Sequence, residues 1–195
     1  MSQFNNVNVV AKANVYFVGK CVSHSVQLAD GSTLWVDEFT TLDFDALAAS
    51  REEPAERTVL FIQEGTAALE IPATALGDDT VRLDYPNGTL FLSKPGFYRF
   101  DLRSGKLHVQ AHAGLAELPA GIGSALLRTG QEAWLDNADR IETSAIPAQA
   151  DDFWAWVQER RSPTPAARTA EMVGTTTAGR TAALDSYGTW VYVDA

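Results

Sequence analysis

The sequence contains few of the residues on which several kinds of protein depend. A single cysteine, Cys21, occurs in 195 residues, so the chain has no internal disulfide and no cysteine-rich zinc site. Only 15 lysines and arginines oppose 25 aspartates and glutamates, and the net charge of -10 disfavours binding to nucleic acid or to an anionic membrane. No apolar run approaches the roughly 18 residues of a membrane span, so we expect no membrane insertion. The amino terminus shows no secretory leader.

What remains is typical of a globular protein: 46% of the residues are hydrophobic and 21% are charged. Apolar and polar residues alternate through residues 80–112, which predicts short antiparallel strands. Turn signals separate these strands at Pro86-Asn87-Gly88, Lys94-Pro95-Gly96 and Arg103-Ser104-Gly105. Turns at intervals of about 8–12 residues are typical of a sandwich or barrel. We therefore predict a mainly β fold: an antiparallel β-sandwich or jelly roll, one short C-terminal helix and a loosely packed tail.

The other strands are predicted from the same signals. An Asp30-Gly31 turn indicates a hairpin, and Glu64-Gly65 indicates a second turn. Residues 37–45 are mixed, although Leu42, Phe44 and Leu47 could continue the core. Residues 48–57 form a polar loop, and residues 113–123 form a wide connection. Strands are expected at residues 14–18, 23–28, 33–36, 58–63 and 66–72, with a last hairpin of residues 124–128 and 131–135 around Thr129-Gly130.

The character of the chain changes near residue 150. Asp151 and Asp152 precede the apolar positions Phe153, Trp156 and Val157, and arginines follow, which matches the dipole and boundary signals of a helix. We predict a sandwich domain over residues 1–136, with a helix and tail over residues 137–195 packing on it. The tail spans residues 162–184, and residues 187–193 form a final strand-like piece.

Most of the chain resembles the FecR-like β domain of proteobacterial envelope proteins, over about residues 25–195. The stretches that carry this resemblance include VQLADGSTLWVDEFTTLDFDAL, VLFIQEGTAALEI, PGFYRFDL, LLRTGQEAWL and SYGTW. The resemblance implies a non-enzymatic periplasmic module for binding or signalling. The missing leader departs from that pattern and leaves the cytoplasm as the alternative location.

The first part of the chain has a different resemblance. SQFNNVNVVAKANVYFVGKCVSHSVQLADGS, residues 2–32, is similar to the start of the pyrimidine/purine nucleoside phosphorylases. Those are small enzymes with a cupin fold that split nucleosides with inorganic phosphate. Because the sequence after Ser32 departs from that family, we transfer no catalytic position from it. We expect a FecR-like binding or signalling domain rather than an enzyme, with the phosphorylase as the alternative.

No set of acid, base and nucleophile converges in the sequence, so we predict no catalytic, cofactor or metal site. His108 and His112 share the polar side of a strand with Gln110, and the third histidine, His24, lies elsewhere. Surface histidines are favoured over a metal site. Cys21 and His24 fall on opposite faces of a strand, which indicates a structural cysteine. A second candidate set consists of Arg82, Arg99 and Arg103, which could hold phosphate but more simply cover the solvated face of a sheet.

The tryptophans are the candidates for contact with a partner. Trp35 falls opposite Leu34 and Val36, and Trp154 lies off the docking face of the predicted helix. Exposed aromatic side chains mark interfaces more often than catalytic sites. We name Trp35, Trp154 and Trp190 as a surface for a protein partner or for self-association, with burial under the C-terminal segment as the alternative.

Overall fold

The structure is a computed structural model. It describes residues 6–8, 23–28, 30–47, 58–73, 81–120, 123–136, 141–148 and 151–161. The chain forms two compact units, Met1–Gln149 and Ala150–Ala195. The predictions for residues 14–18 and 48–57, for Cys21 and for everything after residue 161 lie outside the described residues. In the described part of the chain, no helix is long and apolar enough to cross a membrane.

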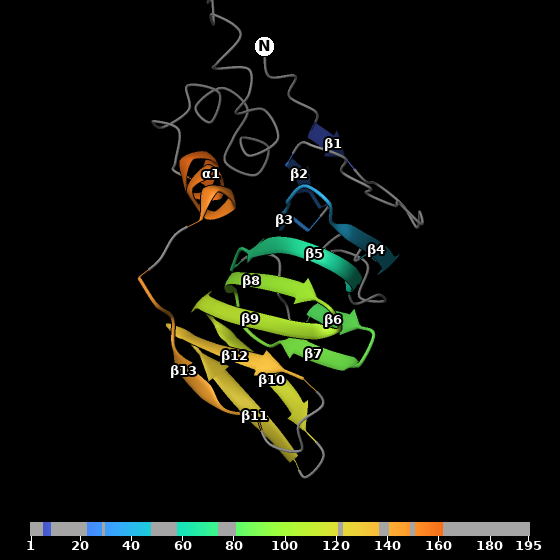
Figure 1. Cartoon of the computed structure of the whole chain (residues 1–195). Coiled ribbons are helices and arrows are strands. Elements are labelled where there is room, and N and C mark those ends of the chain that lie inside the picture. The colour runs from blue at the N-terminus through green and yellow to red at the C-terminus, as the bar shows by residue number, and fades with distance from the viewer. Residues whose placement is uncertain are drawn as a thin grey trace, which may run out of the picture. The chain divides into compact units, whose positions relative to one another are not determined.

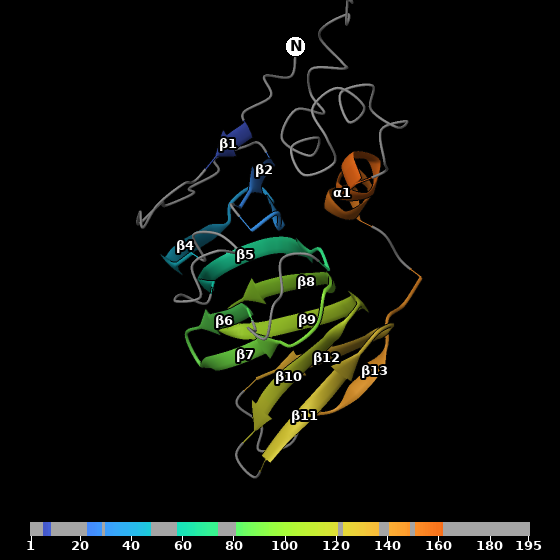
Figure 2. The same cartoon turned by 180° about the vertical axis from the view of Figure 1, so that it is seen from behind.

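The first unit is built from two hydrogen-bonded sheets that share strand β5 (Val59–Ile71), as Figures 1 and 2 show from opposite sides. Sheet A runs in the order β1 (Asn6–Asn8), β2 (His24–Gln27), β3 (Thr33–Val36), β5, β8 (Gly96–Arg103), β9 (Lys106–Ala113), β12 (Gln131–Leu135) and β13 (Thr143–Ala145). Sheet B runs in the order β4 (Thr41–Ala46), β5, β6 (Val81–Tyr85), β7 (Gly88–Leu92), β10 (Leu115–Ala120) and β11 (Gly123–Arg128). This mainly β, nearly closed arrangement confirms the predicted fold class.

The core forms because alternate residues of the strands point to the same side. The residues that face the core are Tyr98, Phe100 and Leu102 on β8 and Leu107, Val109 and Ala111 on β9. The predicted strands between residues 80 and 112 are all present, and the turns between them lie at the predicted positions. The side of sheet A opposite this core carries the intervening residues, which are mostly polar on β9 but include the buried Trp35, Ala68 and Phe97.

Strand β5 passes from one sheet into the other at Gly65. Its first half pairs with β4 and β6 in sheet B, and its second half pairs with β3 and β8 in sheet A. Gly65 has φ of +103°, and a Cβ at this position would overlap Thr40. The Thr40 hydroxyl accepts a hydrogen bond from the Thr66 nitrogen at 2.9 Å and donates one to the Thr66 oxygen at 3.0 Å. The predicted turn at Glu64-Gly65 is therefore wrong: it is a bend within one continuous strand.

Two further segments are more regular than predicted. The mixed stretch of residues 37–45 contributes β4, in which Leu42 and Phe44 point into the core, as expected, on either side of Asp43. The wide connection predicted for residues 113–123 contains β10, which pairs with both β7 and β11. Its composition is rich in residues that usually mark turns, so the pattern of the sequence alone concealed this strand.

The predicted hairpin around Thr129-Gly130 is also wrong in its pairing. Both strands exist, but β11 pairs with β10 in sheet B, whereas β12 pairs with β9 and β13 in sheet A. The turn therefore carries the chain from one sheet to the other. Strand β13 lies beyond the domain boundary predicted after residue 136, and that boundary stays a prediction.

The second unit contains helix α1 (Asp152–Arg161), which confirms the helix predicted from its boundary signals. The Asp151 carboxylate accepts a hydrogen bond from the Trp154 nitrogen at 2.8 Å and so caps the first turn. Phe153 and Val157 are buried. The Arg160 guanidinium lies 4.3 Å from the centre of the Trp156 ring, which shields one face of this aromatic side chain.

Candidate functional site

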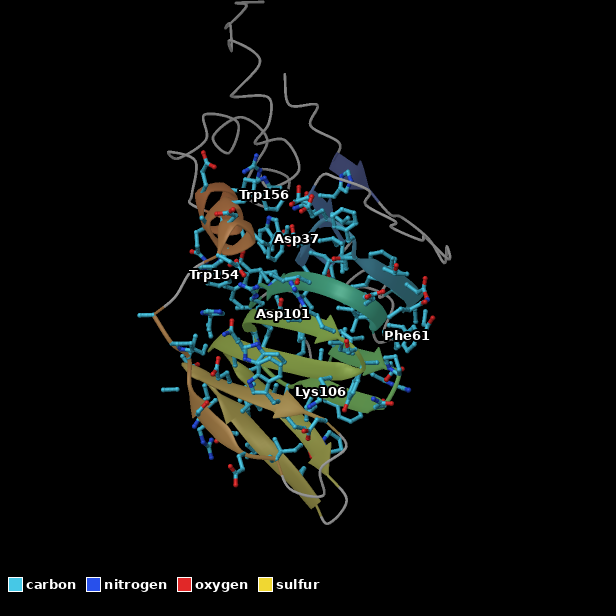
Figure 3. The ribbon with its side chains drawn as sticks, viewed as in Figure 1. Asp37, Phe61, Asp101, Lys106, Trp154 and Trp156 are labelled. Carbon is cyan, nitrogen blue, oxygen red and sulfur yellow. The ribbon has the colours of Figure 1, made fainter. Side chains whose placement is uncertain are left out.

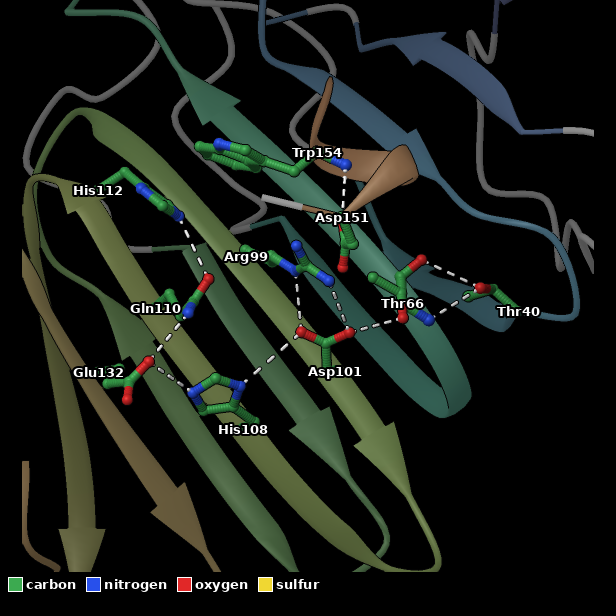
Figure 4. Close-up of polar contacts among 10 residues, drawn as sticks. All are labelled: Thr40, Thr66, Arg99, Asp101, His108, Gln110, His112, Glu132, Asp151 and Trp154. Atoms are coloured by element: carbon green, nitrogen blue, oxygen red, sulfur yellow. Dashed lines mark hydrogen bonds and ion pairs between the residues drawn. The ribbon is translucent and has the colours of Figure 1, made fainter. Parts of the chain in front are cut away.

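The polar side of sheet A carries a connected set of side chains that we call the polar ladder. Cross-strand pairing brings its members together, because Asp101 lies opposite both Thr66 and His108, and Gln110 lies opposite both Arg99 and Glu132. Figure 3 places Asp101 on β8, and Figure 4 shows the hydrogen bonds that join the set. The ladder consists of Thr66, Arg99, Asp101, His108, Gln110, His112 and Glu132.

Asp101 anchors one end of the polar ladder. Arg99 binds its carboxylate through two nitrogens, with Nε at 2.9 Å from Oδ2 and Nη2 at 3.1 Å from Oδ1. The Thr66 hydroxyl donates to Oδ1 at 2.7 Å. The side chains of Arg99 and Asp101 are only 11% and 15% exposed. A two-pronged arginine–carboxylate contact in this shielded setting fixes both groups in place.

His108 stands between two carboxylates. Its Nε2 lies 3.0 Å from Glu132 Oε2, and because an ionised carboxylate can only accept, Nε2 carries a proton. Its Nδ1 lies 3.9 Å from Asp101 Oδ2, which is too long for a hydrogen bond. The imidazole is thus oriented by its hydrogen bond to Glu132 and faces the carboxylate of Asp101 on its other side.

The far end of the polar ladder is held by amide contacts. Gln110 Nε2 donates to the same Glu132 oxygen at 2.9 Å, and Gln110 Oε1 lies 3.3 Å from His112 Nε2. The indole of Trp134 lies flat against His108, with ring centres 4.2 Å apart and 7° between the planes. The His108 imidazole therefore lies among the carboxylates of Asp101 and Glu132 and the indole of Trp134. These residues come from the adjacent strands β8, β9 and β12.

The arginines proposed for phosphate do not gather in one place. Arg82 pairs with Val59 at the start of β5, whereas Arg99 pairs with Ala68 near its end, which puts the two about 30 Å apart along the strand at ~3.3 Å per residue. Arg82 lies on the exposed face, as expected, and Asp84 beside it raises the pKa of its guanidinium. Arg99 is buried, so the prediction of a solvated charge is wrong for it.

His108 and His112 do share one side of a strand with Gln110, as the sequence predicted. They are half-buried and hydrogen-bonded rather than fully solvated. In the part of the chain that the structure describes, no group of three or more histidine, cysteine, aspartate or glutamate side chains is placed to hold a metal ion. The sequence reasoning missed Glu132 and Trp134, although their alternation within β12 puts both on one side.

The tryptophans proposed as a partner surface have different environments. Trp35 is buried, as are Leu34 and Val36. The rings of Trp35 and Phe97 contact each other edge to face, with their centres 5.7 Å apart. Trp154 is partly exposed, and Trp190 lies outside the described residues. A protein partner at these positions stays a prediction. Trp134, which that prediction did not include, has 56% of its surface exposed.

Curated proteins similar to this chain share one name. A pyrimidine/purine nucleoside phosphorylase from Herminiimonas arsenicoxydans is 42% identical over 97 residues, which span 43% of this chain and 93% of that protein. A second from Burkholderia ambifaria is 38% identical over 110 residues, spanning 52% of this chain and 84% of that protein. A third from Methylococcus capsulatus is 60% identical over 47 residues, and there the chain spans 46% of the relative. No family model matches the chain.

Among solved structures, the similarity is to the fold alone. A crystal structure of a proposed anti-sigma factor from Parabacteroides distasonis superposes with a TM-score of 0.56 and 15% sequence identity, over 72% of this chain and 62% of that one. This identity is too low to carry function. The resemblance to FecR-like domains is not shown by these matches.

The non-enzymatic binding or signalling function expected from that resemblance is wrong, because the curated relatives bear the name of an enzyme family. The alternative expectation, based on residues 2–32, is the one supported. Most of those residues lie outside the described part of the chain. The similarity extends well beyond them, since one relative is matched over 93% of its length at 42% identity. The chain therefore belongs to the pyrimidine/purine nucleoside phosphorylase family.

Proposed function

We propose that this protein catalyses the phosphorolysis of nucleosides. A phosphate oxygen forms a bond to C1′ of the sugar as the C1′–N bond to the base breaks. The electron pair of that bond leaves with the base, which takes up a proton, and the products are a sugar 1-phosphate and the free base. The observation that carries the proposal is the 42% identity across 93% of a relative named as such a phosphorylase.

The polar ladder supplies groups that suit this reaction. A leaving base needs a proton, and the hydrogen-bonded pair of His108 and Glu132 is the acid–base pair that the ladder offers. The Glu132 carboxylate could stabilise positive charge that develops on a sugar ring, whereas the charge of Asp101 is already paired with Arg99. Since the arginines do not gather there, the described residues leave the phosphate position unassigned.

The test is direct measurement of base release. Purified protein, produced in a host without its own nucleoside phosphorylases, is incubated with uridine, inosine, guanosine or thymidine, with and without phosphate. We expect free base to appear only with phosphate, matched by an equal amount of sugar 1-phosphate. Base release without phosphate would indicate a hydrolase. No release by protein with the far-ultraviolet spectrum of a β fold would contradict the proposal.

A further inference from the structure

Strand β11 forms one edge of sheet B. It pairs with β10 and with no other strand among the residues that the structure describes. Gly123, Ser124, Leu126 and Arg128 are exposed, and Leu126 has 44% of its surface open to solvent. A strand at the edge of a sheet carries unpaired N–H and C=O groups, which can pair with a strand of another molecule.

The other edge strands in the described part of the chain have features that hinder such pairing. Strands β1 and β13 of sheet A have only three residues each. Strand β4, at the opposite edge of sheet B, carries Asp43 and Asp45, and its register with β5 shifts at two points. By contrast, β11 has six residues in regular register and contains no proline, lysine or acidic residue. Short length, charge and bulges protect the edges of natural sheets, and β11 lacks all three.

The hydrogen bonds of Leu115 show which backbone groups of β11 point outward. Leu115 lies opposite Arg128, yet its nitrogen donates to the Tyr98 hydroxyl and its oxygen accepts from the Ser93 nitrogen, both at 2.9 Å. The Arg128 nitrogen donates to Gln131 Oε1 instead of to Leu115. Leu115 and Arg128 therefore form a pair without hydrogen bonds to each other.

This pair fixes the direction of the other groups, because bonded and non-bonded pairs alternate along an antiparallel ladder. The pairs of Glu117 with Leu126 and of Pro119 with Ser124 are consequently non-bonded as well. Pro119 has no N–H and fits such a position. The N–H and C=O groups of Ser124 and Leu126 therefore point away from β10, towards the open edge.

We propose that this protein forms a symmetric dimer, in which β11 pairs antiparallel with β11 of a second copy. A two-fold axis at Ala125 places Ser124 of each copy opposite Leu126 of the other. Ser124 and Leu126 each offer one N–H and one C=O, so the two strands form four hydrogen bonds with none of these groups left over. Sheet B then continues from one copy into the other.

The side chains of β11 suit a second copy as the partner. Ala125 lies on the axis, and its small side chain permits the spacing of a non-bonded pair, in which the Cα atoms are about 4.5 Å apart. The two Leu126 side chains become diagonal neighbours about 7–8 Å apart, within reach of each other. Arg128 is the only charged residue of β11, so two chains with a net charge of -10 each meet where neither presents an acidic residue of this strand.

The dimer is weak, because pairing of six-residue strands buries a small area. The first test is therefore sedimentation velocity of the purified chain over an about hundredfold range of concentration, where we expect a shift from monomer to dimer. Leu126→Pro removes an N–H that makes no bond to β10, so the fold should persist, as its far-ultraviolet spectrum will show. By symmetry two hydrogen bonds between the copies are lost, and dissociation should become about 10- to 100-fold more favourable.

Ala145→Pro is the matched control, at the edge of sheet A. Ala145 lies opposite Gln131, and the bond from the Ile146 nitrogen to the Gly130 oxygen shows that the N–H of Ala145 also points outward. This variant should dimerise like the unaltered chain. A monomer at every concentration, or equal dimerisation of Leu126→Pro, would overturn the proposal.

Cysteine cross-linking tests the position of the axis independently of proline. In a Cys21→Ser background, Ala125→Cys brings two thiols together at a Cα spacing that a disulfide spans. We expect a disulfide-linked dimer that a reductant separates. Ser144→Cys, at an exposed position of β13, should cross-link at least about tenfold more slowly. Equal cross-linking of the two variants would contradict pairing at Ala125, as would an extended peptide of another protein binding to β11 of a chain that stays monomeric.

Discussion

The hydroxyl of Tyr98 accepts a hydrogen bond from the backbone nitrogen of Leu115 at 2.9 Å, and so joins β8 to the first residue of β10. The same hydroxyl donates to the Lys94 carbonyl at 2.6 Å, in the turn before β8. Tyr98 is fully buried and belongs to the core. A Cβ at Gly114 would overlap this hydroxyl, so the neighbouring backbone can approach only because that position lacks a side chain. One phenol thus holds a strand of sheet A against a strand of sheet B.

Tyr98→Phe should lower the free energy of unfolding by about 1–3 kcal/mol. The substitution keeps the ring but leaves the Leu115 nitrogen without this acceptor in a shielded position. Tyr85→Phe is the control, because Tyr85 also lies in the core cluster, and we expect a smaller loss there. Denaturant unfolding monitored by tryptophan fluorescence gives both values. Equal losses in the two variants would show that the hydrogen bonds of Tyr98 contribute nothing specific.

Stability should fall at alkaline pH partly through Tyr98. Burial raises the pKa of this phenol above its ordinary value of 10.0. The folded protein therefore keeps the proton longer than the unfolded chain does, so folding is disfavoured as the pH rises from about 10 towards the folded pKa. Below pH 10 both states hold the proton, and this contribution to the pH dependence vanishes. Unfolding free energies between pH 8 and 11 should decline less steeply in Tyr98→Phe, and an unchanged slope would contradict the assignment.

Local signals in the sequence predicted most of the strands but not how they pair. The Asp30-Gly31 turn and the alternation around it located β3 at Thr33–Val36, and the turns at residues 86–105 located β6 to β9. The hairpin expected around Thr129-Gly130 failed, because the partners of β11 and β12 are chosen by contacts with β10 and β9. Turn residues indicate where a strand ends, whereas pairing depends on packing between distant segments.

For the candidate site, too, local signals predicted which side chains share a face of a strand but not which strands pair. Period-two alternation correctly placed His108 and Gln110 on one side of a strand. Nothing in that pattern could bring Glu132 to His108, since their meeting depends on the register between β9 and β12. Gly65 is a similar case, because a glycine after a glutamate predicts a turn. In the structure the chain continues as one bent strand, and the distant Thr40 hydrogen-bonds to the backbone beside the bend at Thr66.

Gly65→Ala should destabilise the protein by roughly 3 kcal/mol or more. The residue has φ of +103°, which an L side chain rarely adopts, and the added Cβ would also overlap Thr40. Gly130→Ala is a matched control, with φ of +81° and open space around the added Cβ, so only the conformational cost of about 1–2 kcal/mol remains. Thermal and denaturant unfolding of the two variants separate steric overlap from backbone conformation. Similar losses would mean that β5 can shift away from Thr40 at little cost.

Arg99 and Arg82 allow a matched test of how burial changes the contribution of an ion pair to stability. Each binds the aspartate two residues later through two nitrogens, and each aspartate also accepts a threonine hydroxyl. The arginine side chains differ in exposure, 11% for Arg99 and 46% for Arg82. Removing one member of a shielded pair leaves a charge without its counterion in a weakly screened setting, whereas an exposed pair contributes little.

We therefore expect Arg99→Met to lower the free energy of unfolding by about 2–4 kcal/mol, and Arg82→Met by at most about 1 kcal/mol. Methionine keeps the apolar volume of the arginine stem, so the comparison isolates the guanidinium. Raising the salt concentration should reduce the small effect at Arg82 and leave most of the effect at Arg99, because ions screen exposed charges more strongly. Measurement is by denaturant unfolding at low and high ionic strength. Equal losses for the two variants would show that the Arg99–Asp101 contact is no stronger than a surface pair.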